Sequence, residues 1–344
     1  QYEQAVSMAA DGYFRVHGKL ACAIATSGPG ATNLITGIAS AYYDSVPILV
    51  ITGQVATFRA KKNTGVRQMG FQETDIIDIC RSFTKYSAQI KNPYNILKEI
   101  DKAIKISKEG RPGPVLIDIP DDIQRMLIDP RKLKLNNDFK KVKKKPYPDC
   151  SEIVFSKLKK SKRPVFIFGW GIRLSRSEEL IKKLIQKIQI PVVLTWAVRD
   201  LIGHDQRLLV GGFGTHSARA ANFTVQNADL IISIGSRLDT KATGSPVKTF
   251  ARNAKIIMVD IDKSETNKFK TLGKKIDLSI NTDANEFINN LIKSQNTINN
   301  DDYKNWLNKI EGWKKTFGSI DDFSKIKTKN VNPYLFVKKL CLTK

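Results

Sequence analysis

Residues 20–52 read LACAIATSGPGATNLITGIASAYYDSVPILVIT, and this stretch indicates the fold class of the first part of the chain. Leu20–Thr26 and Pro47–Thr52 are short apolar runs, which predict buried strands. Ala31–Tyr43, between them, predicts a helix. Because parallel strands need a crossover of this kind, the stretch predicts a βαβ unit and hence a parallel sheet.

The same alternation of strands and helices continues along the chain. It predicts an α/β protein with two doubly wound, parallel-sheet domains, the second of them Rossmann-like. A helix over Pro93–Ser107, with one apolar face, and a strand over Val115–Ile119 complete the first domain. The elements expected in the second domain are Pro164–Phe168, Ser177–Ile188, Pro191–Thr195, Leu230–Ile234, Lys255–Ile261 and Asn285–Ile292.

The domain boundaries follow from changes in composition. We expect an N-terminal domain over 1–124, a basic linker over 125–150 and a central domain over 151–295. A second linker, over 296–344, is expected to lead to a domain that is absent from the sequence, with Trp306 and Trp313 on a last helix.

The chain is globular in composition but strongly basic. Of its 344 residues, 57 are Lys or Arg and 33 are Asp or Glu, which gives a net charge of +24. An anionic partner, such as nucleic acid or a membrane surface, is one explanation, and a general enrichment in lysine is the other. The densest cluster, at 140–145, has no interleaved aromatic residue, so we favour the second explanation and expect no nucleic-acid or membrane partner.

Further classes are excluded by other features of the sequence. The apolar runs fall far short of the ~20 residues that a membrane span needs. The four cysteines are scattered without a CxxC pair, which argues against a disulfide scaffold and a zinc site. The first ten residues lack the basic start and apolar core of a signal peptide. We therefore expect a cytoplasmic protein with no metal ligands among its own residues.

The turn over Thr26–Asn33 is the sharpest local feature. Gly28 and Gly30 permit a tight turn, and the start of the following helix offers N–H donors to an anion or a ring. The turn is neither a GxGxxG fingerprint nor a P-loop. Its own residues leave a ligand-binding role and a purely structural role equally open.

Several motifs follow one another in a fixed order around this turn. These motifs are Glu3–Ala5, Met8–Tyr13, Gly18-Lys19, Thr26–Asn33, Asp44–Pro47, Thr52–Val55, Phe71–Asp75 and Gly110–Val115. Together they resemble the pyrimidine-binding domain of thiamine-diphosphate-dependent enzymes, and within that family they are most similar to acetolactate synthase catalytic subunits. The resemblance is strong over 1–124 and looser over 150–295, which is similar to the family's central domain.

The resemblance implies a catalytic role for Glu3. In this family, a glutamate at the matching position hydrogen-bonds the aminopyrimidine ring of thiamine diphosphate and promotes the tautomer that activates the cofactor. This role requires a carboxyl group in a largely dry site, aimed at one ring nitrogen. Without the resemblance, an acid at position 3 is typical of a frayed terminus.

Other roles are also implied by the resemblance. Pro29 and Asn33 would lie near the pyrimidine, while Phe71 and the catalytic Gln72 would face the reaction centre across a dimer interface. The alternatives to these binding roles are structural: Pro29 as a turn proline, Asn33 as an asparagine on the side of a helix, and Phe71 as a core phenylalanine. Arg111 matches an arginine that contacts flavin in acetolactate synthases, and its alternative is an ordinary turn charge.

The second domain contains a further group of candidates. Gly235, Arg237 and Asp260 lie at or near the carboxyl ends of expected strands, where open α/β sheets bind ligands. With Gly214 and Thr215, they match loops that hold FAD in acetolactate synthases. Because the matching loops are empty in many relatives, the resemblance leaves FAD open.

The chain also departs from the family. The loop over 56–70 is longer than in acetolactate synthases, and Asp121 stands where those enzymes have a lysine. Both differences resemble paralogues from surface-polysaccharide gene clusters. The Gly-Asp-Gly motif, which holds Mg²⁺ and the diphosphate in the family's third domain, does not occur in the 344 residues. We therefore expect an internal part of a longer enzyme, inactive alone, whose Mg²⁺ ligands lie in the absent domain.

The expected function is thiamine-diphosphate-dependent decarboxylation of a 2-oxo acid such as pyruvate, followed by carboligation. The family implies a homodimer or tetramer with the active site at its interface, whereas a regulatory subunit is not indicated either way. The alternatives are a polysaccharide-pathway paralogue and a non-catalytic module that binds nucleotides or nucleic acid.

Overall fold

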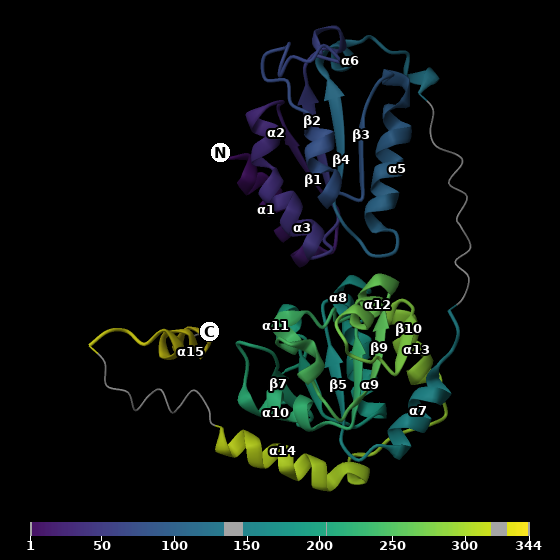
Figure 1. Cartoon of the computed structure of the whole chain (residues 1–344), viewed down its shortest axis with the longest axis vertical. Coiled ribbons are helices and arrows are strands. Elements are labelled where there is room, and N and C mark those ends of the chain that lie inside the picture. Colours follow the sequence, from purple (N-terminus) through teal and green to yellow (C-terminus); the bar gives the residue numbers. More distant parts are fainter. Residues whose placement is uncertain (1, 134–146, 204, 318–328, 343–344) are drawn as a thin grey trace. The chain divides into compact units, whose positions relative to one another are not determined.

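The computed structural model describes residues 2–133, 147–203, 205–317 and 329–342. The chain divides into two compact units, Gln1–Lys144 and Lys145–Lys344, called unit 1 and unit 2. In each unit, helices pack against a parallel sheet (Figure 1). The predicted α/β class is therefore confirmed. The lysine cluster at 140–145 lies outside the described residues.

Unit 1 is built on a four-stranded sheet. Its strands have the order β1-β2-β4-β3, and every pair is parallel. In the ladder, Ala23 faces Val50 and Leu49 faces Val115, so the predicted βαβ unit is confirmed. The strands are β1 (Ala21–Ala25), β2 (Ile48–Gln54), β3 (Tyr86–Gln89) and β4 (Val115–Pro120).

Helices cover the two faces of this sheet. Leu49, Val115 and Ile117 point to the face on which α5 (Ile96–Lys108) packs through Ala103. Helices α1 (Glu3–His17) and α3 (Ile35–Tyr43) pack against each other, and α1 also packs on β1 and β2. As a result, α1 brings its first residue to the turn that follows β1 (Figure 1).

The helices of unit 1 differ in detail from the sequence-based expectation. The helix expected over 31–43 is two helices, α2 (Pro29–Asn33) and α3, which meet at Leu34. The helix expected to begin at Pro93 is preceded by a 3-10 turn, and α5 itself begins at Ile96. Two further short helices are α4 (Ile76–Cys80) and α6 (Asp121–Arg125).

Unit 2 is built on a six-stranded parallel sheet with the order β10-β9-β8-β5-β6-β7. If the six strands are numbered 1 to 6 in chain order, the sheet read from β7 to β10 has the order 3-2-1-4-5-6. This is the strand order of a Rossmann fold, which confirms the predicted class. The chain reverses its direction of winding between β5 and β8. The strands are β5 (Pro164–Phe168), β6 (Val192–Leu194), β7 (Leu209–Gly212), β8 (Leu230–Ile234), β9 (Lys255–Asp260) and β10 (Leu278–Asn281).

The two central strands of unit 2 form the middle of its core, because every residue of β5 and β8 is buried. Helices lie on both sides of the sheet (Figure 1). They are α7 (Ser151–Lys160), α8 (Gly171–Leu174), α9 (Glu178–Lys187), α10 (Arg219–Asn227), α11 (Thr240–Thr243), α12 (Lys263–Thr271) and α13 (Ala284–Lys293).

The core of unit 2 continues beyond residue 295, into a segment that was expected to be a linker. Tyr303 donates a hydrogen bond to the Leu158 carbonyl oxygen (2.8 Å). The indole N–H of Trp306, on α14 (Lys304–Thr316), donates to the Pro164 carbonyl oxygen (3.1 Å). Both side chains are buried, so α14 packs as part of unit 2.

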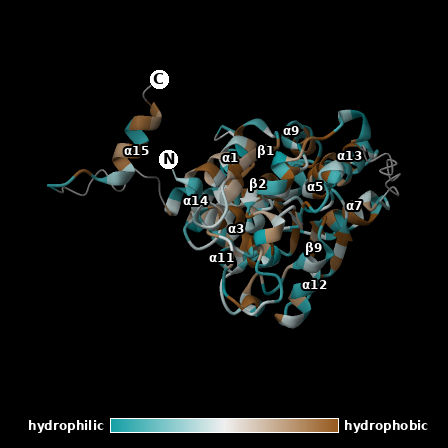
Figure 2. Cartoon of the chain, turned by 90° about the horizontal axis from the view of Figure 1, so that it is seen from above, coloured by the Kyte–Doolittle hydropathy of each residue, from teal (hydrophilic) through white to brown (hydrophobic). Residues whose placement is uncertain are grey.

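The last described helix, α15 (Pro333–Leu342), has no buried residue. Figure 2 shows hydrophobic residues along it, and Tyr334, Phe336 and Leu340 are each more than half exposed. Across the described ranges, no helix combines the length and the apolar character that crossing a membrane requires.

Candidate active site

Glu3 lies in the first turn of α1 and reaches a helix that follows β1. The Asn33 side-chain amide donates a hydrogen bond to Glu3 Oε2 (3.2 Å). Hydrogen bonding by the backbone N–H of Glu3 itself, and then by Asn33, holds the pKa of the Glu3 carboxyl below its usual value. The Glu3 side chain is only partly covered by this chain, so the largely dry environment expected for it is not formed by unit 1 alone.

The turn that faces Glu3 has little space for side chains. Gly28 has φ +64° and ψ −123°, a conformation that residues with a Cβ rarely adopt. A Cβ placed on Gly30 would lie 2.7 Å from Thr26 Cγ2 and 3.5 Å from Glu3 Oε1. Pro29, the first residue of α2, is exposed between these two glycines. The turn itself is therefore tightly packed, while Pro29 and the side chain of Glu3 remain accessible to a ligand.

Gln72 lies against the same turn. A Cβ placed on Gly28 would lie 2.7 Å from Gln72 Cβ and 2.9 Å from its carbonyl oxygen. Gln72 has a φ of +65°, in the left-handed region, and its neighbour Phe71 is 86% exposed. The core-phenylalanine alternative is therefore wrong for Phe71. Unit 1 thus brings Glu3, Asn33 and Gln72 to one turn.

Arg111 lies elsewhere in unit 1. It donates a hydrogen bond from Nε to the Ser45 hydroxyl (2.7 Å), and Ser45 is a buried residue with φ +60°. Ser45 precedes β2 and Arg111 precedes β4, whereas the Gly28 turn follows β1. Because all four strands are parallel, Arg111 lies at the opposite edge of the sheet from Glu3.

In unit 2, the loops after β5 and β8 meet where the winding of the chain reverses. A Cβ placed on Gly169 would collide with the carbonyl oxygen of Gly235, and one on Gly171 would lie 2.6 Å from Gly235 Cα. The Gly171 N–H donates a hydrogen bond to the Gly235 carbonyl oxygen (2.9 Å). These glycines bring two backbone segments into direct contact.

Gly214 and Thr215 follow β7 and are tied to two other segments. The backbone N–H of Gly214 donates to Asn222 Oδ1 (2.8 Å), and the N–H of Thr215 donates to the Lys241 carbonyl oxygen (2.9 Å). The next residue, His216, stacks on Trp196 with a centroid separation of 5.5 Å. The loop after β7 is thus ordered by contacts within unit 2.

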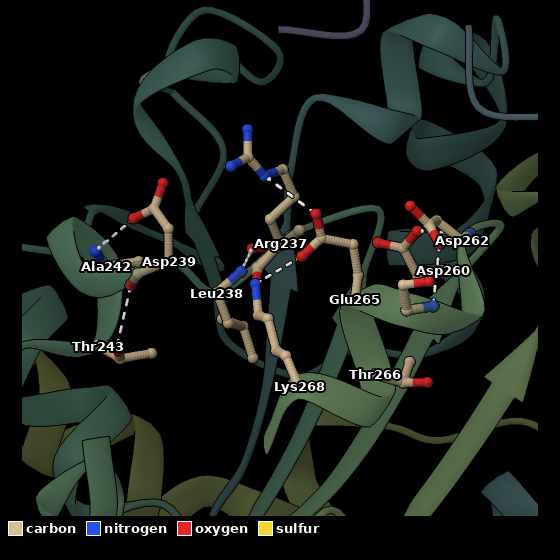
Figure 3. A network of polar contacts seen from close by, with 12 residues as sticks. Arg237, Leu238, Asp239, Ala242, Thr243, Asp260, Asp262, Glu265, Thr266 and Lys268 are labelled. Atoms are coloured by element: carbon tan, nitrogen blue, oxygen red, sulfur yellow. Dashed lines mark hydrogen bonds and ion pairs between the residues drawn. The ribbon is translucent and has the colours of Figure 1, made fainter. Parts of the chain in front are cut away.

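Arg237 and Asp260 belong to a network of polar contacts at the carboxyl ends of β8 and β9 (Figure 3). The carboxylate of Glu265 accepts contacts from Arg237 Nε (3.3 Å) and from Lys268 Nζ (2.5 Å). Lys268 Nζ also donates to the Arg237 carbonyl oxygen (2.6 Å). Asp260 Oδ1 accepts a hydrogen bond from the N–H of Asp262 (2.9 Å).

The sequence-based reasoning missed several polar residues of both units. Glu265 and Lys268 are spaced i, i+3 on α12, and this helical spacing could have indicated their pairing. Asp118, on β4, is 1% exposed and accepts a hydrogen bond from the Thr52 hydroxyl (2.7 Å). Glu73, whose carboxylate binds backbone N–H groups of the loop before α4, lies within the Phe71–Asp75 motif, but the resemblance implied no role for it. Within the described ranges, no cluster of three or more His, Cys, Asp or Glu side chains could hold a metal ion.

Two family models match the chain. The model described as "Thiamine pyrophosphate enzyme, N-terminal TPP binding domain" matches residues 1–79. The model described as "Thiamine pyrophosphate enzyme, central domain" matches residues 152–291. The two matches fall in unit 1 and unit 2, respectively.

Curated proteins named as acetolactate synthase large subunits are similar to nearly the whole chain. The chain is 34% identical to a probable large subunit from Methanococcus aeolicus, a match that covers 99% of the chain and 57% of that protein. The chain is 36% identical to a probable large subunit from Methanocaldococcus jannaschii, a match that covers 99% of the chain and 56% of that protein. It is 35% identical to the large subunit from Lactococcus lactis, and this match covers 90% of the chain and 52% of that protein. The chain therefore spans just over half the length of these relatives.

Proposed function

The chain belongs to the thiamine pyrophosphate enzymes, and from this premise we propose that it forms the pyrimidine-binding and central parts of an acetolactate synthase-like enzyme. The whole enzyme would decarboxylate a 2-oxo acid such as pyruvate and join the remaining fragment to a second carbonyl compound. One observation carries the proposal: Asn33 holds the carboxylate of Glu3 at the Gly28–Gly30 turn, onto which Gln72 also packs.

The residues around the turn fit the aminopyrimidine half of thiamine diphosphate. The cofactor supplies the electron sink for decarboxylation, while the protein supplies position and electrostatics. The Glu3 carboxylate would accept a hydrogen bond from the ring, and Asn33 would orient that carboxylate. Pro29 would contact the ring, and Gln72 would face the reacting atoms. A ring can approach the turn here because Pro29 is exposed and the side chain of Glu3 is only partly covered.

The diphosphate half of the cofactor needs other residues. Mg²⁺ prefers oxygen ligands and uses the phosphates of the cofactor. We propose that these ligands belong to a further domain, that the first domain spans 1–124, and that the central domain begins at 151 and continues past 295 to include α14. We also propose a cytoplasmic location for the whole enzyme.

A second copy of the chain would complete the site. Exposed apolar side chains on the loop that carries Gln72 support an interface: Met69 is 53% exposed and Phe71 is 86% exposed. Large exposed apolar groups that cluster on one surface mark interaction sites. In a homodimer or tetramer, Phe71 would be covered and would face the cofactor of the partner.

We extend the proposal to a flavin nucleotide at the carboxyl edge of the sheet in unit 2. The backbone of Gly235, at the point where the winding reverses, and the loop at Gly214-Thr215 fit a nucleotide there. Arg237 and Asp260 would line the same edge. The test is visible absorption and fluorescence of the purified protein: flavin released on denaturation supports the assignment, and its absence after reconstitution with FAD overturns it.

The test of the function is cofactor dependence and product identity. The chain is combined with the diphosphate-binding domain of the enzyme and incubated with pyruvate, with and without thiamine diphosphate and Mg²⁺. Acetolactate should form only when both are present. Consumption of pyruvate that does not depend on thiamine diphosphate would overturn the proposal.

A second candidate is a paralogue that acts on another 2-oxo acid, which Asp121 and the 56–70 loop favour. Asp121 begins α6 and pairs with Arg125 (2.9 Å), so an acid replaces the lysine of acetolactate synthases at this helix. This candidate predicts cofactor-dependent release of carbon dioxide from a different 2-oxo acid, without acetolactate. A nucleic-acid-binding module would instead show binding to labelled DNA or RNA with a steep dependence on salt.

A further inference from the structure

The loop over 60–75, which carries Phe71 and Gln72, is organised by a single carboxylate. Glu73 Oε1 accepts a hydrogen bond from the backbone N–H of Lys61 (2.7 Å). Glu73 Oε2 accepts from the N–H of Met69 (2.8 Å) and from the N–H of Gly70 (3.4 Å). One side chain therefore holds the two ends of a segment that has no helix or strand of its own.

Further contacts fasten this loop to itself and to the sheet. Lys61 Nζ pairs with Asp75 (2.5 Å), so the residue whose N–H is bound by Glu73 is also bound through its side chain. Gln68 Nε2 donates to the carbonyl oxygen of Glu73 (3.0 Å). Gln54, at the end of β2, donates to the Thr74 carbonyl oxygen (2.7 Å). Glu73 thus lies at the point where the loop joins the sheet.

The conformation that these contacts hold is a costly one. The backbone of Gln72 lies in the left-handed region, at φ +65°, a conformation that a residue with a side chain keeps only when its surroundings enforce it. Its Cβ packs directly on Gly28. Glu73, the next residue, is in a position to enforce this geometry. Partial desolvation of the Glu73 carboxyl raises its pKa. Hydrogen bonds from the backbone N–H groups of Met69, Lys61 and Gly70 outweigh this effect, so the pKa of Glu73 is lowered overall.

We propose that Glu73 is a positioning residue: its carboxylate holds the 60–75 loop closed, so that Gln72 stays packed on Gly28 beside Glu3. Glu73 itself does not touch the reacting atoms. It acts through Gln72 and through the turn that faces Glu3. The catalytic consequence rests on the proposed function, whereas the coupling of the loop to the turn does not.

The first test needs no activity. Hydrogen exchange is measured on the whole chain and on its Glu73→Gln variant, with Asp78→Asn as a matched control. Asp78 is a nearby acid on α4 that pairs only with exposed Arg81, so its loss should leave the loop unchanged. In Glu73→Gln, the amides of Lys61 and Met69 should exchange about tenfold faster, because hydrogen bonds to a charged acceptor are lost.

Exchange of the peptide over 26–33 should also quicken in Glu73→Gln, since Gln72 no longer presses on Gly28. If the loop and this peptide both exchange as in the parent chain, the inference is wrong. It is also wrong if only the loop loosens, because Glu73 would then not position the turn.

The second test uses the enzyme with its diphosphate-binding domain. Glu73→Gln should lower kcat by about tenfold while the KM for thiamine diphosphate stays within about twofold, because the reacting groups are misplaced but the cofactor still binds. An unchanged kcat would overturn the positioning role. If the parent enzyme shows no cofactor-dependent turnover, the proposed function fails, and the exchange result still decides whether Glu73 couples the loop to the turn.

Discussion

Units 1 and 2 both place polar side chains at the carboxyl edge of a parallel sheet, but they satisfy those side chains in different ways. In unit 2, Glu265 is paired with Arg237 and Lys268, and the loop after β5 rests directly on Gly235. In unit 1, Glu3 is partly exposed and the turn beside it carries no side chain at Gly28 or Gly30.

The same fold class thus supports a sheet edge held by its own contacts in unit 2 and a sheet edge with an accessible carboxyl group in unit 1. The edge of unit 2 is fastened by its own ion pairs and backbone contacts, so its order does not depend on a ligand. The edge of unit 1 is held by Glu73 and Gln54 from outside the turn, and Glu3 and Pro29 stay accessible. Substitutions in unit 2 should therefore affect stability, whereas those at the turn of unit 1 should affect function.

The largest effect is expected from Gly169→Ala in unit 2. The new Cβ would collide with the carbonyl oxygen of Gly235 and lie 2.5 Å from Ser236 Cα, and neither backbone segment can move away. We expect a loss of about 3 kcal/mol in the free energy of unfolding. All four tryptophans lie in unit 2, so urea unfolding followed by tryptophan fluorescence measures it.

The matched control for this substitution is Gly12→Ala in α1, where a Cβ would meet nothing within 4 Å. This change should leave the urea midpoint of the tryptophan-fluorescence transition unchanged and stabilise unit 1 by about 0.5–1 kcal/mol. A Gly169→Ala transition that coincides with that of the control would contradict the close contact between the two loops.

A smaller effect is expected from Glu265→Gln. The Glu265 side chain is 11% exposed, but those of Arg237 and Lys268 are 42% and 30% exposed, so the two cations can regain water. We expect a loss of about 1–2 kcal/mol, below the value for a fully buried pair. Glu179→Gln, which removes an exposed pair with Lys182, should cost less than about 0.5 kcal/mol in the same tryptophan assay. Equal losses in the two variants would show that the network of Figure 3 does not fasten the edge of unit 2.

The smallest effect concerns Asp118 in unit 1 and depends on pH. Burial raises the pKa of its carboxyl, although hydrogen bonds from Gln89, Thr52 and Gln54 oppose that shift. The folded carboxyl therefore keeps its proton to a higher pH than the unfolded one. Between about pH 4 and the raised pKa, the folded unit binds more protons, so the contribution of Asp118 to stability falls as the pH rises.

Asp118→Asn should remove this fall and lower the free energy of unfolding at pH 7 by about 1 kcal/mol. The amide oxygen can still accept from Thr52, but the amide NH2 group would face the donor groups of Gln89 and Gln54. The measurement is thiol labelling of Cys80 in urea between pH 4 and pH 7. Cys80 is buried, and burial raises its pKa to about 12, so it should react only when unit 1 unfolds. The same pH dependence in both proteins would rule out Asp118 as its source.

The central strands of both sheets could be predicted from sequence because they are continuous apolar runs. The expected strands at Pro164–Phe168 and Leu230–Ile234 have the same bounds as β5 and β8. The edge strands β3, β7 and β10 were missed. Each has only four residues, and β3 and β10 are partly exposed, so their sequences carry no apolar run. Long α1 was missed because its hydrophobic pattern is interrupted by exposed Met8 and Tyr13.

The site could be predicted only as far as the family's motifs reach. They indicated Glu3, Asn33 and Gln72, whose proximity depends on tertiary contacts that spacing does not reveal. The Phe71–Asp75 motif includes Glu73 but did not indicate its role, because its partners are backbone N–H groups, which are the same for any sequence. A carboxylate that binds backbone leaves no pattern of complementary residue types.

The most direct test of the account is the turnover of Glu3→Gln in the enzyme with its diphosphate-binding domain, pyruvate, thiamine diphosphate and Mg²⁺. An amide keeps the shape of the side chain but cannot take part in proton transfer as the carboxyl group does, so we predict a fall in kcat of about 100-fold or more. Glu179→Gln should turn over like the parent, and both variants should unfold in urea like the parent. A Glu3→Gln enzyme that retains the parent kcat would contradict the assignment of the Gly28–Gly30 turn as the active site.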